Sequence, residues 1–228
     1  MINFGEAFWE VLPLLLAGAV TTLWITALAV TGGVVIGLVM GIARLADNFL
    51  VRTLARIYID FIRGTPLLVQ ILLLYFGIPH LLLMITKQQM PINVYVAGVT
   101  ACAINSGAYV AEIVRAGIQS IERGQTEAAR SLGMTKGQTM RYIILPQAFK
   151  RIIPPLGNEF IAMLKDTSLL MVIGVEELTR KGQLYISVTF ASFPVYLGIL
   201  LIYLVMTLSI SRLVTYAERR LAVSDYSN

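Results

Sequence analysis

Four polar residues in apolar surroundings have the types and spacing that could do chemistry. Asn105 and Tyr109 lie one helical turn apart in one apolar stretch, and Glu159 and Asp166 lie seven residues apart in another. These spacings place each pair on one face of a helix. Polar groups in lipid are costly, so they usually line a cavity or pair with one another. An amide, a hydroxyl and two carboxylates at similar depth could hold a zwitterionic solute on its way across a membrane.

The same residues also permit a structural interpretation. Lys165 adjoins Asp166 and could neutralise it, and Asn158 belongs to the same neighbouring stripe. A structural network and a substrate route are not exclusive. Carboxylates that face a route suit an ammonium or guanidinium group, which favours a basic solute. If Lys165 neutralises Asp166, that preference vanishes.

Neither catalysis nor metal binding is expected. Cys102 is the only cysteine and His80 the only histidine, so a Cys/His metal site is not expected. We interpret Cys102 as a small packing residue and His80 as a residue at the end of a span. The chain has no HExxH, GxSxG or GxxxxGK[ST] motif, so it offers no known hydrolase signature and no phosphate loop for ATP.

The elements that must position these side chains are membrane-spanning helices. The chain is 57% hydrophobic, with a mean hydropathy of +0.77, and its apolar runs are long enough to cross lipid. We expect an all-α membrane protein, a single permease-like domain over residues 1–228, with five spans. The expected spans are about 11–43, 57–85, 91–114, 152–174 and 194–216.

Three local features qualify these spans. Pro66 must interrupt the helical hydrogen-bond ladder within the second. Gly33, Gly37 and Gly41 form a stripe of small residues in the first, which we interpret as helix packing. Residues 176–192 are more polar and predict an interfacial helix or loop.

Lys and Arg placement predicts the orientation. The net charge of +5 is dispersed near the span ends rather than gathered on a soluble face, so no nucleic acid partner is expected. Three basic residues fall on one side: Lys87, Arg180 and Lys181. Thirteen fall on the other: Arg44, Arg52, Arg56, Arg115, Arg123, Arg130, Lys136, Arg141, Lys150, Arg151, Arg212, Arg219 and Arg220. The positive-inside rule then places the N-terminus outside and the C-terminus in the cytoplasm.

A polar block interrupts the apolar pattern at residues 127–146, EAARSLGMTKGQTMRYIILP. Thr126 could cap a short helix with Glu127 in its first turn, and Gly133 permits a left-handed turn. A second helix from about Lys136 is expected to stop before Pro146. Two short helices joined at a glycine would form a rigid knob for a soluble partner. An ordinary solvated loop is the alternative.

This block resembles the EAA loop of ABC importer permeases. The residues that carry the resemblance are Glu127, Ala128, Ala129, Gly133, Ile143, Leu145 and Pro146. The segments RGTPLLVQ (63–70), NSGAYVAEIVRAGI (105–118), ILPQAFKRIIPPLGNEF (144–160) and LKDTSL (164–169) resemble permeases of the polar amino acid uptake family.

The resemblance implies a type I ABC importer permease in a bacterial inner membrane. Residues 118–148 would form a cytoplasmic coupling loop for a separate ATPase that binds ATP and Mg²⁺. A second permease chain, identical or paralogous, and an extracytoplasmic solute-binding protein would complete the assembly. The substrate would be a polar, and by the carboxylate argument a basic, amino acid.

Two other functions remain to be weighed. An ion-coupled secondary transporter would also place carboxylates at mid-membrane, but it predicts internal symmetry and no docking block. An intramembrane enzyme would need a catalytic constellation that the chain lacks. Copurification of an ATPase in mild detergent separates these readings.

Overall fold

Helices form almost the whole chain in the computed structural model, which describes residues 4–222. No strand occurs within that range. The α-helices are α1 (Phe4–Ala43), α2 (Phe49–Arg63), α3 (Leu67–Leu72), α4 (Ile78–Thr86), α5 (Val94–Gln119), α6 (Arg123–Ser131), α7 (Lys136–Thr139), α8 (Leu145–Asp166), α9 (Leu178–Thr189) and α10 (Ser192–Ala222). Two π-helical turns, η1 (Leu73–Gly77) and η2 (Met140–Ile144), and a 3-10 helix, η3 (Thr167–Ile173), complete the order. The expected polar tail after Arg220 falls mostly outside the described residues.

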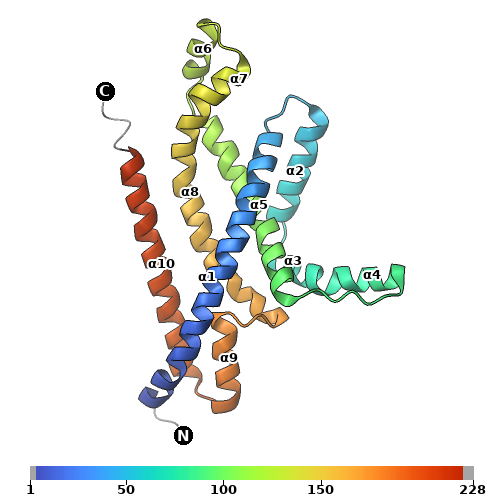
Figure 1. Cartoon of the computed structure of the whole chain (residues 1–228), viewed down its shortest axis with the longest axis vertical. Coiled ribbons are helices and arrows are strands. Elements are labelled where there is room, and N and C mark those ends of the chain that lie inside the picture. The colour runs from blue at the N-terminus through green and yellow to red at the C-terminus, as the bar shows by residue number, and fades with distance from the viewer. Residues whose placement is uncertain (1–3, 223–228) are drawn as a thin grey trace.

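The most extensive helix contact joins α1 to α5 in the middle of the bundle (Figure 1). A Cβ atom at Gly37 would lie 2.5 Å from the Val110 side chain, and one at Gly33 would lie 2.7 Å from Ser106. The two backbones can approach this closely only because these residues have no side chain. The small-residue stripe therefore serves helix packing.

Four helical segments in the described part are long and apolar enough to cross a membrane. They are Gly5–Ala43, Leu67–Thr86, Val94–Gln119 and Ser192–Arg220. The expected span 152–174 is not among them. It corresponds to α8, which carries Glu159, Lys165 and Asp166, followed by the 3-10 helix η3. The count of five spans stays a prediction.

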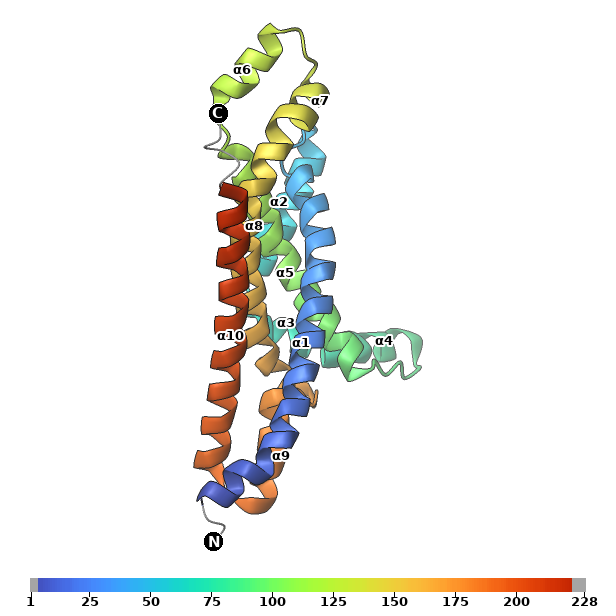
Figure 2. The ribbon, with the colours of Figure 1, turned by 60° about the vertical axis from the view of Figure 1, so that its left-hand side comes forward.

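The expected second span, 57–85, is divided in two. The helix α2 ends at Arg63, and Pro66 forms the N-cap of α3. Beyond this break, α3, η1 and α4 turn away from the bundle as a lateral arm (Figures 1 and 2). The Gln70 amide stabilises the corner, because it donates to the carbonyl oxygens of Ile62 (2.8 Å) and Thr65 (3.1 Å). Proline chemistry explains the break, whereas the direction of the arm is set by packing.

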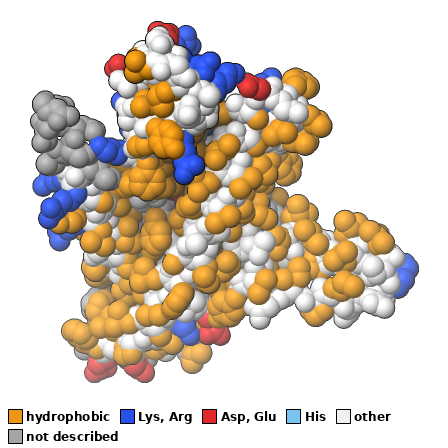
Figure 3. Space-filling model, turned by 45° about the horizontal axis from the view of Figure 1, so that its top comes forward, with side chains coloured by type: hydrophobic (Ala, Val, Ile, Leu, Met, Phe, Trp, Pro, Cys, Tyr) orange, Lys and Arg blue, Asp and Glu red, His pale blue; other side chains and the backbone are white. Residues whose placement is uncertain are grey.

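The two ends of the molecule differ. The pair α6–α7 projects beyond the bundle at one end, and the C-terminal turns of α10 lie toward that same end (Figure 2). The start of α1 lies at the opposite end, beside α9. Lys and Arg side chains gather at the α6–α7 end and on α10, on a surface that is otherwise largely hydrophobic (Figure 3).

A buried carboxylate fixes α9 to the bundle. Glu177 is fully buried, and its carboxylate accepts from the backbone N–H groups of Thr179 and Arg180, both at 2.8 Å. The Tyr203 hydroxyl of α10 donates to it at 3.2 Å, and Thr22 of α1 accepts from Leu178 N–H at 3.2 Å. Burial raises the pKa of Glu177 above its ordinary value, against the opposing effect of these donors. Contacts from α1, α9 and α10 thus meet around Glu177 and Leu178, and the local sequence does not predict this.

Candidate functional site

Polar side chains form a bridge from α3 through α5 to α8. The Asn105 amide donates to the Gln70 side-chain oxygen at 2.9 Å. The next residue, Ser106, donates its hydroxyl to Glu159 at 2.8 Å. Asn105 and Ser106 are both buried. Sequence reasoning selected Asn105 and Glu159, but it missed Gln70 and Ser106, because only the fold brings these partners together.

The second carboxylate of α8 lies closer to solvent. Asp166 is exposed at the last residue of the helix, within electrostatic range of Glu159. Among the described residues, no ion pair within 4.0 Å joins Lys165 to Asp166. The charge of Lys165 still acts on Asp166. The two carboxylates therefore share one face of α8, one held by Ser106 and the other more open.

Tyr109 faces a different space from Asn105. Its ring is 39% exposed and stacks under the Arg63 guanidinium, whose carbon lies 5.3 Å from the ring centre. Tyr109 and Arg63 line a groove of about 460 Å³, together with Glu112, Arg151 and part of α5. The structure thus joins Asn105 and Glu159 through adjacent residues of α5, while Tyr109 belongs to a neighbouring groove on the side of the α6–α7 end.

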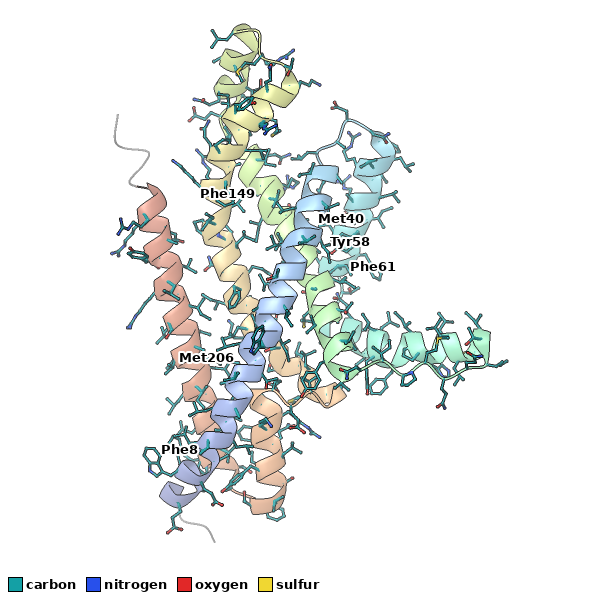
Figure 4. All side chains as sticks on the ribbon, viewed as in Figure 1. Phe8, Met40, Tyr58, Phe61, Phe149 and Met206 are labelled. Carbon is teal, nitrogen blue, oxygen red and sulfur yellow. The ribbon has the colours of Figure 1, made fainter. Side chains whose placement is uncertain are left out.

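Helix α2 is tied to α5 beside this groove. The Tyr58 hydroxyl donates to the Ile104 carbonyl oxygen at 2.7 Å, between the two helices (Figure 4). Ile104 directly precedes Asn105 on α5. The position of the polar bridge is therefore fixed from α2 as well as from α3 and α8.

The EAA loop, residues 118–148, forms a two-helix knob whose turn is made by Gly133. This residue has φ +83°, and a Cβ there would meet no atom within 4 Å. The Met134 N–H donates to the Ala129 carbonyl oxygen at 3.2 Å, and Thr135 with Gln138 forms a capping box at the start of α7. The glycine is needed for its backbone conformation, not for space.

Two details of the expected loop are wrong. The first helix begins at Arg123, not after Thr126, so Glu127 lies in the middle of α6 and not in its first turn. The second helix does not stop before Pro146. It continues through the π-helical turn η2 into α8, and Pro146 directly follows that turn. Proline and π-helical turns both disturb the regular ladder of helical hydrogen bonds, so the two occur together here without ending the helix.

The loop residues divide into a packed side and an open side. Ala129 and Ile144 are buried. Ile144 belongs to an apolar cluster that includes Val110 and Val114 of α5, and Ile143 packs against this cluster. Glu127, Ala128, Gly133, Leu145 and Pro146 are exposed. Sequence reasoning missed Leu132, which is 85% exposed at the tip, and Tyr142, which is 62% exposed. Both side chains are large and apolar on a knob that is otherwise mostly polar.

The knob is also held to the rest of the chain. The Lys136 ammonium lies 3.5 Å from the Asp47 carboxylate in the turn between α1 and α2. Arg151 of α8 donates to the Ser120 carbonyl oxygen at the end of α5. No cluster of three or more His, Cys, Asp or Glu side chains suited to a metal ion occurs in residues 4–222.

Comparison with known proteins identifies the family. Residues 33–223 match the family described as binding-protein-dependent transport system inner membrane component. The glutamine transport system permease protein GlnP of Escherichia coli K12 is 42% identical over 218 residues, which cover 96% of this chain and 97% of that protein. The L-cystine transport system permease protein TcyL of Bacillus subtilis 168 is 37% identical over 212 residues, covering 93% and 89%.

Solved structures agree with these relatives. An amino acid ABC transporter crystallised with histidines contains a chain 49% identical to this one, with a TM-score of 0.89 and coverage of 96% and 99%. The MetNI methionine ABC transporter contains a chain that is 18% identical, with a TM-score of 0.67 and coverage of 90% and 96%, and shares the fold. The all-helical fold is therefore that of a type I ABC importer permease, and this chain belongs to the family of binding-protein-dependent transport system inner membrane components.

Proposed function

We propose that the chain is the transmembrane permease of an ATP-driven importer for polar amino acids. Its family membership supports this function, as do its relatives, a glutamine permease and an L-cystine permease. The observation that carries the proposal is the EAA loop. It is an exposed, internally capped knob with Leu132 at its tip, at the end of the molecule where basic residues gather.

The energy source is a separate ABC ATPase that binds ATP and Mg²⁺. The chain has no GxxxxGK[ST] phosphate loop of its own. Glu127, Ala128, Gly133, Leu145 and Pro146 lie on the open side of the knob and face the ATPase. Ala129 and Ile143 act indirectly: Ala129 is buried within the knob, where α6 contacts η2, and Ile143 packs against the apolar cluster that includes α5.

Movement of the ATPase reaches the membrane through one continuous helical run. The elements α7, η2 and α8 follow one another without a break from Lys136 to Asp166. A displacement of the knob therefore moves Glu159 and Asp166 with it. Closure of two ATPase subunits would draw two knobs together and switch the route between inward-facing and outward-facing states.

The substrate route passes Asn105, Tyr109, Glu159 and Asp166. Asn105 is buried against Gln70, so it shapes the wall, while the more open Asp166 and the Ser106-bound Glu159 offer negative charge. Two carboxylates favour a substrate that carries a cationic side chain. Lys165 forms no ion pair with Asp166 within 4.0 Å, although its charge acts on Asp166 and reduces this preference.

The working assembly contains two permease chains, identical or paralogous, in a bacterial inner membrane. The knob and the C-terminus face the cytoplasm, and the N-terminus lies outside, where a solute-binding protein delivers the amino acid. The distribution of thirteen basic residues against three supports this orientation. Nothing in residues 4–222, which the structure describes, favours an ion-coupled carrier over this assembly.

Reconstitution tests the function directly. The permease is purified with the ABC ATPase that accompanies it from native membranes and is placed in liposomes with its solute-binding protein. We expect amino acid uptake to require ATP, and ATP hydrolysis to rise when the loaded binding protein is added. Uptake that follows a proton or Na⁺ gradient and ignores ATP would refute the proposal.

A further inference from the structure

A cavity lined by arginines lies where the ends of α1 and α5 meet α2. It has a volume of about 350 Å³, and we call it the arginine pocket. Its lining residues are Arg44, Phe49, Arg52, Thr53, Arg56, Arg115 and Gln119. The substrate route and the open side of the EAA loop share none of these residues.

Positive charge in the pocket exceeds negative charge. Asp60 lies 3.6 Å from Arg44 and 3.7 Å from Arg56, and Glu112 pairs with Arg115 and lies 3.9 Å from Arg44. Four guanidinium groups therefore face two carboxylates. Arg52 contributes no ion pair to this balance and donates instead to the Ala46 carbonyl oxygen at 3.2 Å. The pocket is built to receive a further anion.

Two buried atoms in this cluster also lack hydrogen-bond partners. They are Nη1 of Arg44 and Oε2 of Glu112. The contacts of Arg44 with the two carboxylates, at 3.6 and 3.9 Å, are too long for hydrogen bonds. A buried charged donor without an acceptor is costly, so the positive charge of Arg44 is only partly compensated by the two carboxylates. The guanidinium of Arg44 therefore adds to the positive charge that lines the pocket.

The surroundings match the boundary between lipid and water. The pocket includes Phe49, which is 72% exposed, and the same helix exposes Leu50 and Leu54 at 64% and 59%. An apolar strip beside a basic pocket suits acyl chains next to a phosphate group. Arginine forks also match the geometry of phosphate oxygens.

We propose that the arginine pocket binds a phosphate group, carried by an anionic phospholipid headgroup or by inorganic phosphate. The pocket lies at the α6–α7 end of the bundle, which is the cytoplasmic leaflet if the proposed orientation holds. The binding itself does not depend on that orientation.

The test uses the full permease, stripped of lipid in mild detergent. Phosphatidylglycerol or phosphatidylcholine is added, and bound lipid is counted by native mass spectrometry. Inorganic phosphate is titrated separately while thermal unfolding is followed. Arg52 and Arg56 are exposed, so Arg52→Gln with Arg56→Gln removes charge and loses only the contacts of Arg52 with Ala46 and of Arg56 with Asp60. A hydrogen bond to a charged group is worth about tenfold in affinity or more, so we expect a loss of at least about tenfold.

A matched variant controls for net charge. Arg212→Gln with Arg219→Gln removes two exposed arginines from α10, toward the same end of the molecule, and should leave binding unchanged. Selective retention of phosphatidylglycerol assigns a lipid headgroup, whereas protection by phosphate alone assigns a soluble ligand. Equal loss in both double variants, equal retention of the two lipids without phosphate binding, or no binding of any probe would overturn the proposal.

Discussion

Glu159 combines a structural contact with spare capacity for a ligand. Its carboxylate accepts one hydrogen bond from Ser106, while an ionised carboxylate offers about four acceptor positions. The structural and the substrate interpretations of this residue therefore coexist. What separates them experimentally is the charge, since an amide can keep the Ser106 contact and cannot attract a cation.

We predict that Glu159→Gln and Asp166→Asn weaken transport of a cationic amino acid without loss of the assembled complex. A hydrogen bond to a charged group contributes about 1.5–3 kcal/mol, so each change should raise the KM about tenfold to a hundredfold. Uptake into proteoliposomes measures this. Glu6→Gln at the far end of α1 removes the same charge and should have no effect. Wild-type rates in both α8 variants would make these carboxylates purely structural.

Glu177 and its neighbour Glu176 should give opposite pH dependences. Burial raises the pKa of Glu177, so its contribution to stability is present below about pH 4.5 and is lost as the pH rises through the folded-state pKa. A hydrogen bond from Lys181, with its charge, lowers the pKa of Glu176. That contribution is present above about pH 4.5 and is lost as the pH falls through the lowered pKa.

As the pH rises above about 4.5, the Glu177→Gln variant should therefore become more stable relative to the wild type, as measured by thermal unfolding. Each unit by which the pKa is raised corresponds to about 1.4 kcal/mol. Glu176→Gln, measured in the same detergent, serves as the control and should instead be slightly less stable than the wild type above about pH 4.5. A parallel pH profile for the wild type and Glu177→Gln would show that the carboxylate is already satisfied by Tyr203 and the two N–H groups.

At the scale of elements, local chemistry predicts the turns well and the helix lengths less well. Pro66 and Gly133 mark real breaks, because proline lacks an N–H and glycine adopts φ +83°. The predicted stop before Pro146 is wrong, because the π-helical turn η2 lies directly before this proline and the helix continues into α8. Contacts such as Ser106 with Glu159 span 53 residues, so only tertiary packing brings them together.

We predict that Gly133→Val uncouples the knob from the ATPase. A left-handed backbone costs an L-residue about 1–2 kcal/mol, and a β-branched side chain suffers most. Since no atom lies within 4 Å of a Cβ there, the damage should stay in the turn. Membrane insertion should be normal, while substrate-stimulated ATP hydrolysis and transport should fall at least tenfold.

Two neighbouring substitutions make that result interpretable. Gly133→Asn should retain most activity, because asparagine tolerates the left-handed region. Gly137→Ala lies in α7, where a Cβ also meets nothing within 4 Å, and should be neutral. If Gly133→Val transports at the wild-type rate, the turn is not part of the docking surface.

The whole molecule is polarised along its long axis. The knob and the last described turns of α10 occupy one end, and the start of α1 with α9 occupies the other (Figure 2). The polar bridge of Asn105, Ser106 and Glu159 lies between them on the central helices. An importer needs this arrangement, because ATP acts at one face and the solute arrives at the other.

The orientation predicts that the two ends label from opposite sides of the membrane. In a Cys102→Ser background, single cysteines are placed at Glu6 and at Ser227, which lies outside the described residues. Cys102 is buried, so replacing it with serine removes its thiol without changing the exposed surface. Cysteine replacing Arg219, an exposed residue near the end of α10, provides a second probe on the C-terminal side. A membrane-impermeant maleimide applied to intact spheroplasts should reach only the cysteine at position 6. Labelling of both ends from one side would mean an even number of crossings and would refute the five-span orientation.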